Sequence, residues 1–228
     1  MDVVILVVRD GALQVLLVQR GEEPFRGRWA LPGGFKRPAE TLDQAAAREV
    51  VEETGVDARY RLRQFGAYGD PGRDPRLNVV TVGYLAAMAQ VPQPVAGTDA
   101  AAAALVPARE VLDGDRALAF DHARIVGDAI DRVRLELDLS GLAIAFLGPT
   151  FTLAELRSVY EAVWDARLDP ANFRRSVADG AWVIPTGERT TPGPIGGRPA
   201  ERFRAGDAWL TGSPIRRWAG TSERRSTT

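Results

Sequence analysis

The chain has 228 residues, of which 45% are hydrophobic and 26% charged, and its formal net charge is −1. This is the composition of a globular protein, and the length allows one large domain or two small ones. The sequence contains no cysteine, which excludes a disulfide framework and a thiolate zinc site. Because it shows neither a signal peptide nor an apolar run of about 20 residues, we expect a cytoplasmic protein without a membrane span.

The first part of the chain begins with several predicted strands. A turn at Arg9-Asp10-Gly11 separates two apolar runs and predicts a β-hairpin over residues 3–20. Further strands are predicted in the segments 28–35, 60–69 and 77–88. In contrast, residues 91–103 read as a loop that leads into a stretch of small residues.

Two helices are predicted in this part, over residues 39–53 and 121–137. Gly55 lies just past the first helix, where it can serve as a C-cap. One buried side of that helix is expected to contain Thr41, Leu42, Ala45, Ala46 and Val50. Because strands alternate with helices, we predict an α/β domain over residues 1–137.

The rest of the chain predicts a second, smaller domain. Thr152 and Glu155 form a capping box before a helical run, and Asp169-Pro170 opens a second helix that Gly180 ends. Two short predicted strands then flank a loop rich in glycine and proline, which completes the element order of a winged helix. The predicted segments are a linker at 138–148, a winged helix-turn-helix domain at 149–205 and a partly disordered tail at 206–228.

Three carboxylates crowd the segment REVVEETG at residues 48–55. Glu52 and Glu53 lie three and four positions after Glu49, so all three share a helix face although like charges there repel. Such a cluster of hard oxygen donors suits Mg²⁺ or Mn²⁺, and Arg48 can orient a carboxylate from the next turn. The alternative is a solvated acidic helix face without a ligand.

The glutamates belong to a wider pattern that starts at Gly34, continues through Glu40 and ends with residues 48–56. This pattern resembles the Nudix box at every constrained position. The resemblance implies an α/β/α sandwich with a mixed sheet, a nucleoside diphosphate derivative as ligand, and bound Mg²⁺ or Mn²⁺ that activates water for attack at phosphorus. It implies catalytic roles for Arg48, Glu49, Glu52 and Glu53, and metal ligands at Gly33 and the same three glutamates.

Residues 65–86 resemble the branch of the Nudix family that acts on ADP-ribose. Arg73 and Arg76 in this segment are candidates to contact a phosphate or the distal ribose, although the same residues also make a good polar turn. Further ligand contacts are expected at Gly34 and Phe35. The rings that could stack on adenine, unless they belong to the core, are those of Trp29, Phe35 and Tyr68.

A hydrolase of this branch also needs a general base, which the residues leave open. The candidates lie far from the box, at Asp99, Glu110, Asp113 and Asp115, and each is also a plausible surface acid. His122 is the single histidine of the sequence. At a predicted helix start it favours a structural cap or a satisfied polar group over a catalyst.

The second helix of the winged helix domain carries Asn172, Arg174 and Arg175, and the following loop carries Arg189 and Arg198. Asparagine can read adenine and arginine can read guanine in the major groove, while further arginines hold phosphates. These five residues are therefore the predicted DNA contacts. The alternative is a dimerisation or lid module whose arginines are ordinary surface charge.

The second domain resembles the C-terminal domain of the Nudix-related transcriptional regulators, the NrtR family, over nearly its whole length. The resemblance implies a homodimeric repressor of NAD-metabolism genes that binds palindromic operator DNA and senses ADP-ribose or a related nucleotide. Because the Nudix box is complete, hydrolysis remains open. The alternatives are a Mg²⁺-dependent ADP-ribose pyrophosphatase with an accessory dimerisation domain, and a regulator with a sugar ligand.

Overall fold

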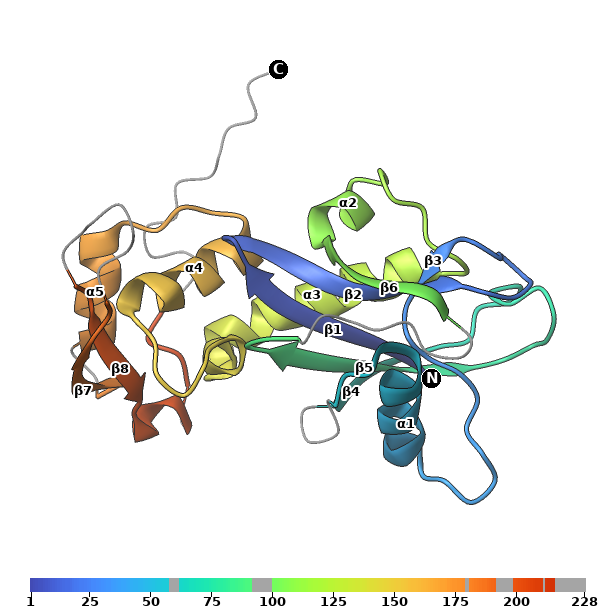
Figure 1. The fold of residues 1–228 in the computed structure, drawn as a ribbon, viewed down its shortest axis with the longest axis horizontal. Coiled ribbons are helices and arrows are strands. Elements are labelled where there is room, and N and C mark those ends of the chain that lie inside the picture. Colours follow the sequence, from blue (N-terminus) through green and yellow to red (C-terminus); the bar gives the residue numbers. More distant parts are fainter. Residues whose placement is uncertain (58–61, 92–99, 179–180, 192–198, 211, 216–228) are drawn as a thin grey trace. The chain divides into compact units, whose positions relative to one another are not determined.

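The computed structural model describes residues 1–57, 62–91, 100–178, 181–191, 199–210 and 212–215 (Figure 1). The chain divides into two compact units, Met1–Arg132 and Val133–Thr228, and each is described here by itself. In the described part of the chain, no helix is both long and apolar enough to cross a membrane.

The first unit contains a six-stranded mixed sheet in the order β3-β2-β1-β5-β4, with β6 paired to β2. The pair β1–β5 is parallel, and the other pairs are antiparallel. The predicted hairpin and the later strands are confirmed. The strands are β1 (Asp2–Arg9), β2 (Ala12–Arg20), β3 (Trp29–Ala30), β4 (Arg63–Tyr68), β5 (Thr81–Met88) and β6 (Ala100–Pro107).

Strand β6 corrects the expectation of a loop running into small residues. Its sequence, AAAAALVP, is rich in alanine, which has little intrinsic preference for strands. The segment nevertheless pairs with β2 in a long antiparallel register that places Leu16 opposite Leu105 and Val15 opposite Val106. Tertiary pairing with a strongly apolar neighbour therefore overrides the local propensity.

Both faces of the central strand β1 are buried. Val3, Ile5 and Val7 pack in one cluster with Ala46 and Val50 of helix α1 (Leu42–Thr54). The alternate residues of β1 are also fully buried, and helix α3 (His122–Leu139) passes behind the strands in Figure 1. The short helix α2 (Ala108–Leu112) follows β6. A strand buried on both faces reads as a continuous apolar run, as residues 3–8 do.

Helix α1 begins later than expected. Thr41 is its N-cap and forms a capping box with Gln44, so it lies at the exposed helix start and not on a buried side. Leu42 is also exposed, because the first turn extends beyond the core. The buried side is formed by Ala45, Ala46, Val50 and Thr54. Gly55 adopts the left-handed conformation (φ +69°) and ends the helix, as predicted.

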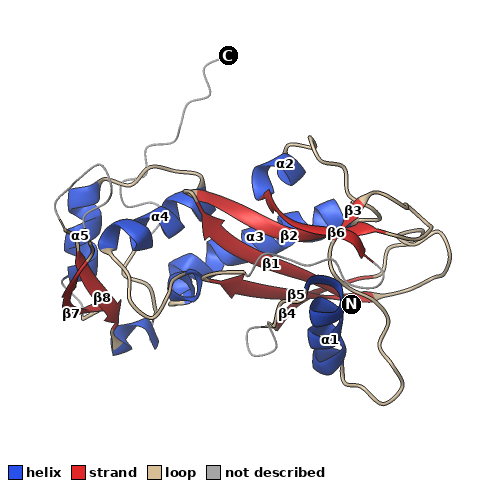
Figure 2. Cartoon of the chain, in the orientation of Figure 1, coloured by secondary structure: helices blue, strands red, loops and turns tan. Residues whose placement is uncertain are grey.

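The second unit contains the predicted helix, turn, helix, strand, loop and strand (Figure 2). The capping box of Thr152 and Glu155 is present, and Asp169 accepts a hydrogen bond from Asn172 N at 2.8 Å. Gly180, the predicted stop of the second helix, lies outside the described residues. The elements are the 3₁₀ helix η1 (Leu142–Phe146), α4 (Leu153–Trp164), α5 (Pro170–Ala178), β7 (Val183–Arg189) and β8 (Glu201–Ala205).

The first part of the predicted tail packs against the second unit. A 3₁₀ helix, η2 (Asp207–Leu210), follows β8, and the Trp209 ring meets the Trp182 ring edge-on at 5.3 Å. The Trp209 backbone lies so close to Gly141 that a Cβ on this glycine would be 2.5 Å from the Trp209 carbonyl oxygen. Ser213 then shares a buried hydrogen bond of 3.0 Å with Tyr160. Residues 216–228 lie outside the described residues.

Candidate functional site

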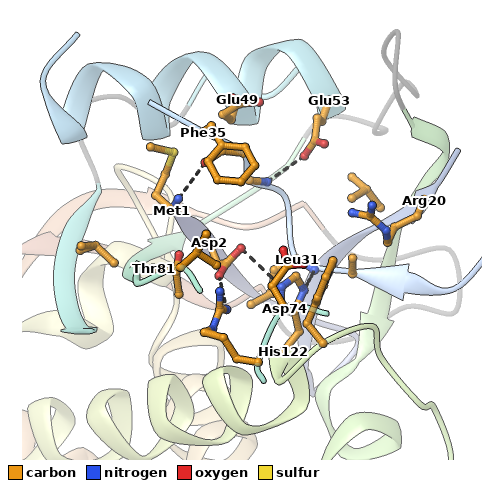
Figure 3. A pocket seen from close by; sticks show the side chains of 18 of the residues that line it. Met1, Asp2, Arg20, Leu31, Phe35, Glu49, Glu53, Asp74, Thr81 and His122 are labelled. Atoms are coloured by element: carbon orange, nitrogen blue, oxygen red, sulfur yellow. Dashed lines mark hydrogen bonds and ion pairs between the residues drawn. The ribbon is translucent and has the colours of Figure 1, made fainter. Parts of the chain in front are cut away.

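The first unit contains a cavity of about 520 Å³, which suits a ligand of nucleotide size. Its walls come from the start of β1, the end of β2, the glycine loop after β3 and the cavity-facing side of α1. The loop between β4 and β5 and the start of α3 complete it. Figure 3 shows side chains from these segments converging on the space.

Two of the three predicted glutamates line this cavity, and the third does not. Glu53 accepts a hydrogen bond from Gly33 N at 2.9 Å. Glu49 lies against Gly34, where an added Cβ would be 2.5 Å from a carboxylate oxygen. Glu52 is 43% exposed and pairs with Arg37 instead. The cluster expected from helical spacing is therefore a pair of carboxylates at the cavity plus one outside it.

Arg48 compensates the crowding of like charges. Its guanidinium donates to Glu40 at 2.5 Å and to both Glu49 and Glu52 at 2.8 Å, and it is only 16% exposed. The hydrogen bond from Arg48 lowers the pKa of Glu40 to about 2, and Arg37 N contributes to the same shift. The Arg48 guanidinium also donates to the Phe35 carbonyl oxygen, so its hydrogen bonds join the glycine loop to α1.

The donor set at the cavity fits a divalent cation in part. Within the described residues, no group of three histidine, cysteine or acidic side chains is arranged to hold a metal ion by itself. Mg²⁺, however, usually takes one or two carboxylates and completes its shell with water and phosphate oxygens. Glu49 and Glu53 supply two carboxylates at the cavity, so a cation that arrives with a diphosphate fits these residues.

The two arginines predicted to bind the ligand are both bonded to carboxylates. Arg73 is 7% exposed, donates to both oxygens of Asp121 at 3.0 and 2.7 Å, and reaches Asp2 at 3.1 Å. Arg76 forms a two-pronged pair with Asp74 at 3.0 and 2.7 Å. Both arginines line the cavity, but Arg73 is held in its wall by buried acids.

His122 is a buried, satisfied polar group at the start of α3, in agreement with the structural interpretation. Its Nδ1 accepts a hydrogen bond from Leu31 N at 2.9 Å, and its Nε2 lies 3.4 Å from Asp2. Burial raises the pKa of Asp2, but His122, the N-terminal amine and the Thr81 hydroxyl outweigh it and hold that pKa well below its usual range. Asp2 is therefore ionised within the cavity wall.

Of the residues predicted to stack on the base or to act as general base, only Phe35 lines the cavity in the described structure. Phe35 lines the cavity and is 60% exposed, whereas Trp29 and Tyr68 are not among the lining residues. Three of the acids proposed as general bases, Glu110, Asp113 and Asp115, do not line the cavity either. Glu110 pairs with Arg116, and Asp113 pairs with Arg109. The fourth, Asp99, lies outside the described residues. The carboxylates that do line it are those of Asp2, Glu22, Glu49, Glu53 and Asp74.

Arg20 and Phe120 are among the lining residues that were not predicted. Arg20 ends β2, and Phe120 precedes α3 with a positive φ of 54°. The guanidinium carbon of Arg20 lies 4.9 Å from the centre of the Phe120 ring. A signal for Arg20 would have been its position at the end of a buried strand, where side chains project into sites. Phe120 had no such signal, since its contacts with Arg20, Phe25 and Arg76 are distant in sequence.

In the second unit, the predicted DNA contacts lie on the exposed side of α5. Phe173 and Val177 are buried, which turns Asn172, Arg174 and Arg175 outward. Arg175 donates a hydrogen bond to the Asn172 side-chain oxygen. Arg189 is exposed at the end of β7, and the prediction for Arg198 lies outside the described residues.

Comparison with protein families agrees with both units. Residues 1–127 match the NUDIX domain, and residues 143–205 match the NrtR DNA-binding winged helix domain. The chain therefore belongs to the Nudix family, and it combines a Nudix domain with an NrtR winged helix. The predicted fold class, a mixed α/β Nudix fold followed by a winged helix, is confirmed. Nudix hydrolases in general use divalent metal ions.

Two known proteins, one of them seen in two solved structures, are similar over large parts of the chain. The ADPR responsive transcriptional repressor NtrR of Acinetobacter baylyi is 34% identical over 206 residues, covering 89% of this chain and 80% of that protein. The crystal structure of Shewanella oneidensis NrtR complexed with a 27mer DNA is 31% identical with a TM-score of 0.75, covering 97% and 98%. The NUDIX domain of the same protein complexed with ADP ribose is 36% identical with a TM-score of 0.54, covering 58% and 85%.

Proposed function

We propose that the protein is a cytoplasmic transcriptional repressor of NAD-metabolism genes that responds to ADP-ribose or a related NAD-derived nucleotide. The observation that carries the proposal is the combination of a nucleotide-sized cavity with two facing carboxylates in one unit and an outward arginine face on α5 in the other. The likeness to an ADP-ribose-responsive repressor over 89% of the chain supports the same assignment.

The nucleotide binds in the cavity of the first unit. Its diphosphate lies near Glu49 and Glu53, which hold Mg²⁺ or Mn²⁺ together with the phosphate oxygens and the Gly33 carbonyl. When bound, the cation neutralises phosphate charge. Phe35 offers an exposed ring at the cavity for stacking with the base. Glu52 contributes through Arg48 and not by direct contact with the ligand.

Operator DNA binds to the second unit. Helix α5 enters the major groove, where Asn172 reads adenine and Arg174 and Arg175 read guanine or hold phosphates. Arg189, at the end of β7, and Arg198 contact the DNA backbone. A homodimer presents two such helices, so a palindromic operator follows from its two-fold symmetry. Nucleotide binding changes the affinity for DNA, and the same coupling changes nucleotide affinity when DNA binds.

Hydrolysis of ADP-ribose is a second candidate function, favoured by one observation. Glu49 and Glu53 both face the cavity, as a site that activates water at a diphosphate requires. Release of AMP and ribose phosphate from ADP-ribose with Mg²⁺ measures this activity directly. A plain pyrophosphatase would show rapid release and no DNA binding.

A gel-shift titration with DNA from upstream of the protein's own gene tests the main proposal. We expect a retarded complex that ADP-ribose dissociates in a concentration-dependent way. The experiment is run at two salt concentrations, because phosphate contacts make DNA affinity depend steeply on salt. The absence of a complex at either salt concentration would contradict the repressor proposal.

A further inference from the structure

In the described part of the chain, two side chains bond to the backbone of the glycine loop at residues 31–34. Glu53 accepts a hydrogen bond from Gly33 N, and His122 Nδ1 accepts one from Leu31 N, each at 2.9 Å. Glu53 is also a proposed cation ligand, so the ligand engages that anchor directly. His122 therefore supplies the side-chain anchor that holds the loop independently of the bound cation.

The imidazole of His122 is fixed in one orientation and one tautomer. Because Leu31 N is a donor, Nδ1 carries no proton, and the ring proton lies on Nε2, which is 3.4 Å from the ionised Asp2. Arg73 in turn donates to Asp2 at 3.1 Å. The His122 ring is buried, with its centre 5.1 Å from that of Phe120. Both of its nitrogens thus face protein groups and not the cavity space.

The Leu31 amide leads directly into the part of the loop that faces the ligand. Leu31, Gly33, Gly34 and Phe35 all line the cavity, and Figure 3 shows Leu31 and His122 in one wall of the pocket. Leu31 is buried, so its N–H would be left without a partner if the imidazole acceptor were removed, which is costly. Rotation of this peptide toward another partner would displace the Gly33 carbonyl and the Phe35 ring.

We propose that His122 is a positioning residue of the nucleotide site, acting through the Leu31 amide and not by contact with the ligand. This inference rests on the proposed function of the cavity. The imidazole holds the glycine loop in its ligand-binding conformation before the nucleotide arrives. Such preorganisation raises affinity, because the loop does not have to be ordered at the moment of binding.

Two amide substitutions separate the roles of the two ring nitrogens. His122→Asn places an amide oxygen as many bonds from the backbone as Nδ1, so it still accepts from Leu31 N. His122→Gln places its amide at the position of Nε2, so it keeps a partner for Asp2 and leaves Leu31 N without an acceptor. Isothermal titration of the full chain with ADP-ribose and with inorganic pyrophosphate, both with Mg²⁺, gives the affinities. We expect His122→Gln to weaken both ligands roughly 10-fold or more and His122→Asn to stay within about threefold of the wild type.

Tyr84→Phe is the matched control for a lost buried hydrogen bond. Tyr84 is fully buried in the same unit, its hydroxyl donates to Asp43 at 2.6 Å, and it does not line the cavity. We expect this variant to lower the melting temperature and to bind both ligands as the wild type does. Equal losses of affinity in His122→Asn and His122→Gln, or no loss in either, would overturn the inference. So would a loss in Tyr84→Phe as large as that in His122→Gln.

Hydrogen–deuterium exchange of residues 29–35 without ligand separates the inference from the proposed function. We expect faster exchange in His122→Gln and exchange near that of the wild type in His122→Asn. Unchanged exchange in His122→Gln would overturn the inference even if the wild type binds ADP-ribose. If the wild type binds pyrophosphate but not ADP-ribose, the proposed function fails, and the pyrophosphate affinities of the two variants still decide the role of His122.

Discussion

The two units use arginine in opposite ways. In the first unit, Arg73 in the cavity wall is 7% exposed and Arg48 beside the glycine loop is 16% exposed, and each bonds two or more acids, so their side chains are fixed before any ligand binds. On α5, Arg174 and Arg175 lie on the exposed side of the helix. The contrast agrees with the two proposed sites, since a small-molecule site gains from preorganised pairs, whereas a DNA-reading surface keeps its cations at the solvent.

The largest effect on stability is expected from Arg73→Ala, which tests whether the paired arginines of the first unit are fixed. Removing a guanidinium that is 7% exposed takes from the partly buried Asp121 the partner that binds both of its oxygens, and it takes from Asp2 one of its positive partners. We expect a loss of about 3–5 kcal/mol in the free energy of unfolding of the first unit. Denaturant titration measures it, with Arg76→Ala as the control, because Arg76 is 43% exposed and should cost much less. A loss below about 1 kcal/mol for Arg73→Ala would contradict the fixed-pair interpretation.

The next largest effect is expected from Glu53→Gln. The amide oxygen can still accept the hydrogen bond from Gly33 N, but the charge that holds a cation is lost. We expect any hydrolysis of ADP-ribose to fall by about 100-fold or more, with DNA binding unchanged. Release of AMP and ribose phosphate with Mg²⁺ or Mn²⁺ gives the rate. Glu52→Gln should have a smaller effect, since this side chain points outside the cavity; an equal loss would show that Glu52 reaches the ligand.

Arg175→Ala tests the other side of the comparison. Truncating an outward arginine removes a base or phosphate contact without disturbing the core. We expect DNA affinity to fall about 10-fold and the salt dependence to weaken, while ADP-ribose affinity and the melting temperature stay unchanged. Fluorescence anisotropy with operator DNA provides the measurement. Normal DNA binding in both Arg174→Ala and Arg175→Ala would place the DNA surface elsewhere.

The smallest effect is expected at Glu161, which supports the turn before α5. Its side chain accepts a hydrogen bond from Leu168 N at 2.9 Å and lies 3.5 Å from Arg157 and 3.8 Å from Arg167. Glu161→Ala should weaken DNA binding a few-fold by loosening the turn, at a cost of about 1 kcal/mol. Glu161→Gln keeps the acceptor and should restore most of the affinity. If both variants behave alike, the ion pairs and not the hydrogen bond fix the turn.

Local signals in the sequence were reliable. The capping box at Thr152, the Gly55 stop and the apolar periodicity of α3 each depend on neighbours a few residues away. Strand β6 was missed because its alanines carry no strand signal and its stability comes from pairing with distant β2.

The candidate site was predicted in outline but not in detail. Spacing placed Glu49 and Glu53 on one helix face, yet it could not show that Glu52 turns away to Arg37. Arg73, which was expected to contact the ligand, is bonded to acids instead, and Arg20, for which nothing was predicted, lines the cavity. Whether an arginine is bonded to an acid or remains available depends on partners such as Asp121, 48 positions away from Arg73, which no local pattern reports.

The contact between Trp209 and Gly141 has a practical consequence for anyone dissecting this protein. The match to the winged helix domain ends at residue 205, and a fragment cut there would lose the indole that packs against Trp182 and the hydroxyl that pairs with Tyr160. Such a truncated piece would expose apolar surface and tend to precipitate. An isolated DNA-reading fragment should therefore be carried at least to Ile215, whose side chain is itself buried.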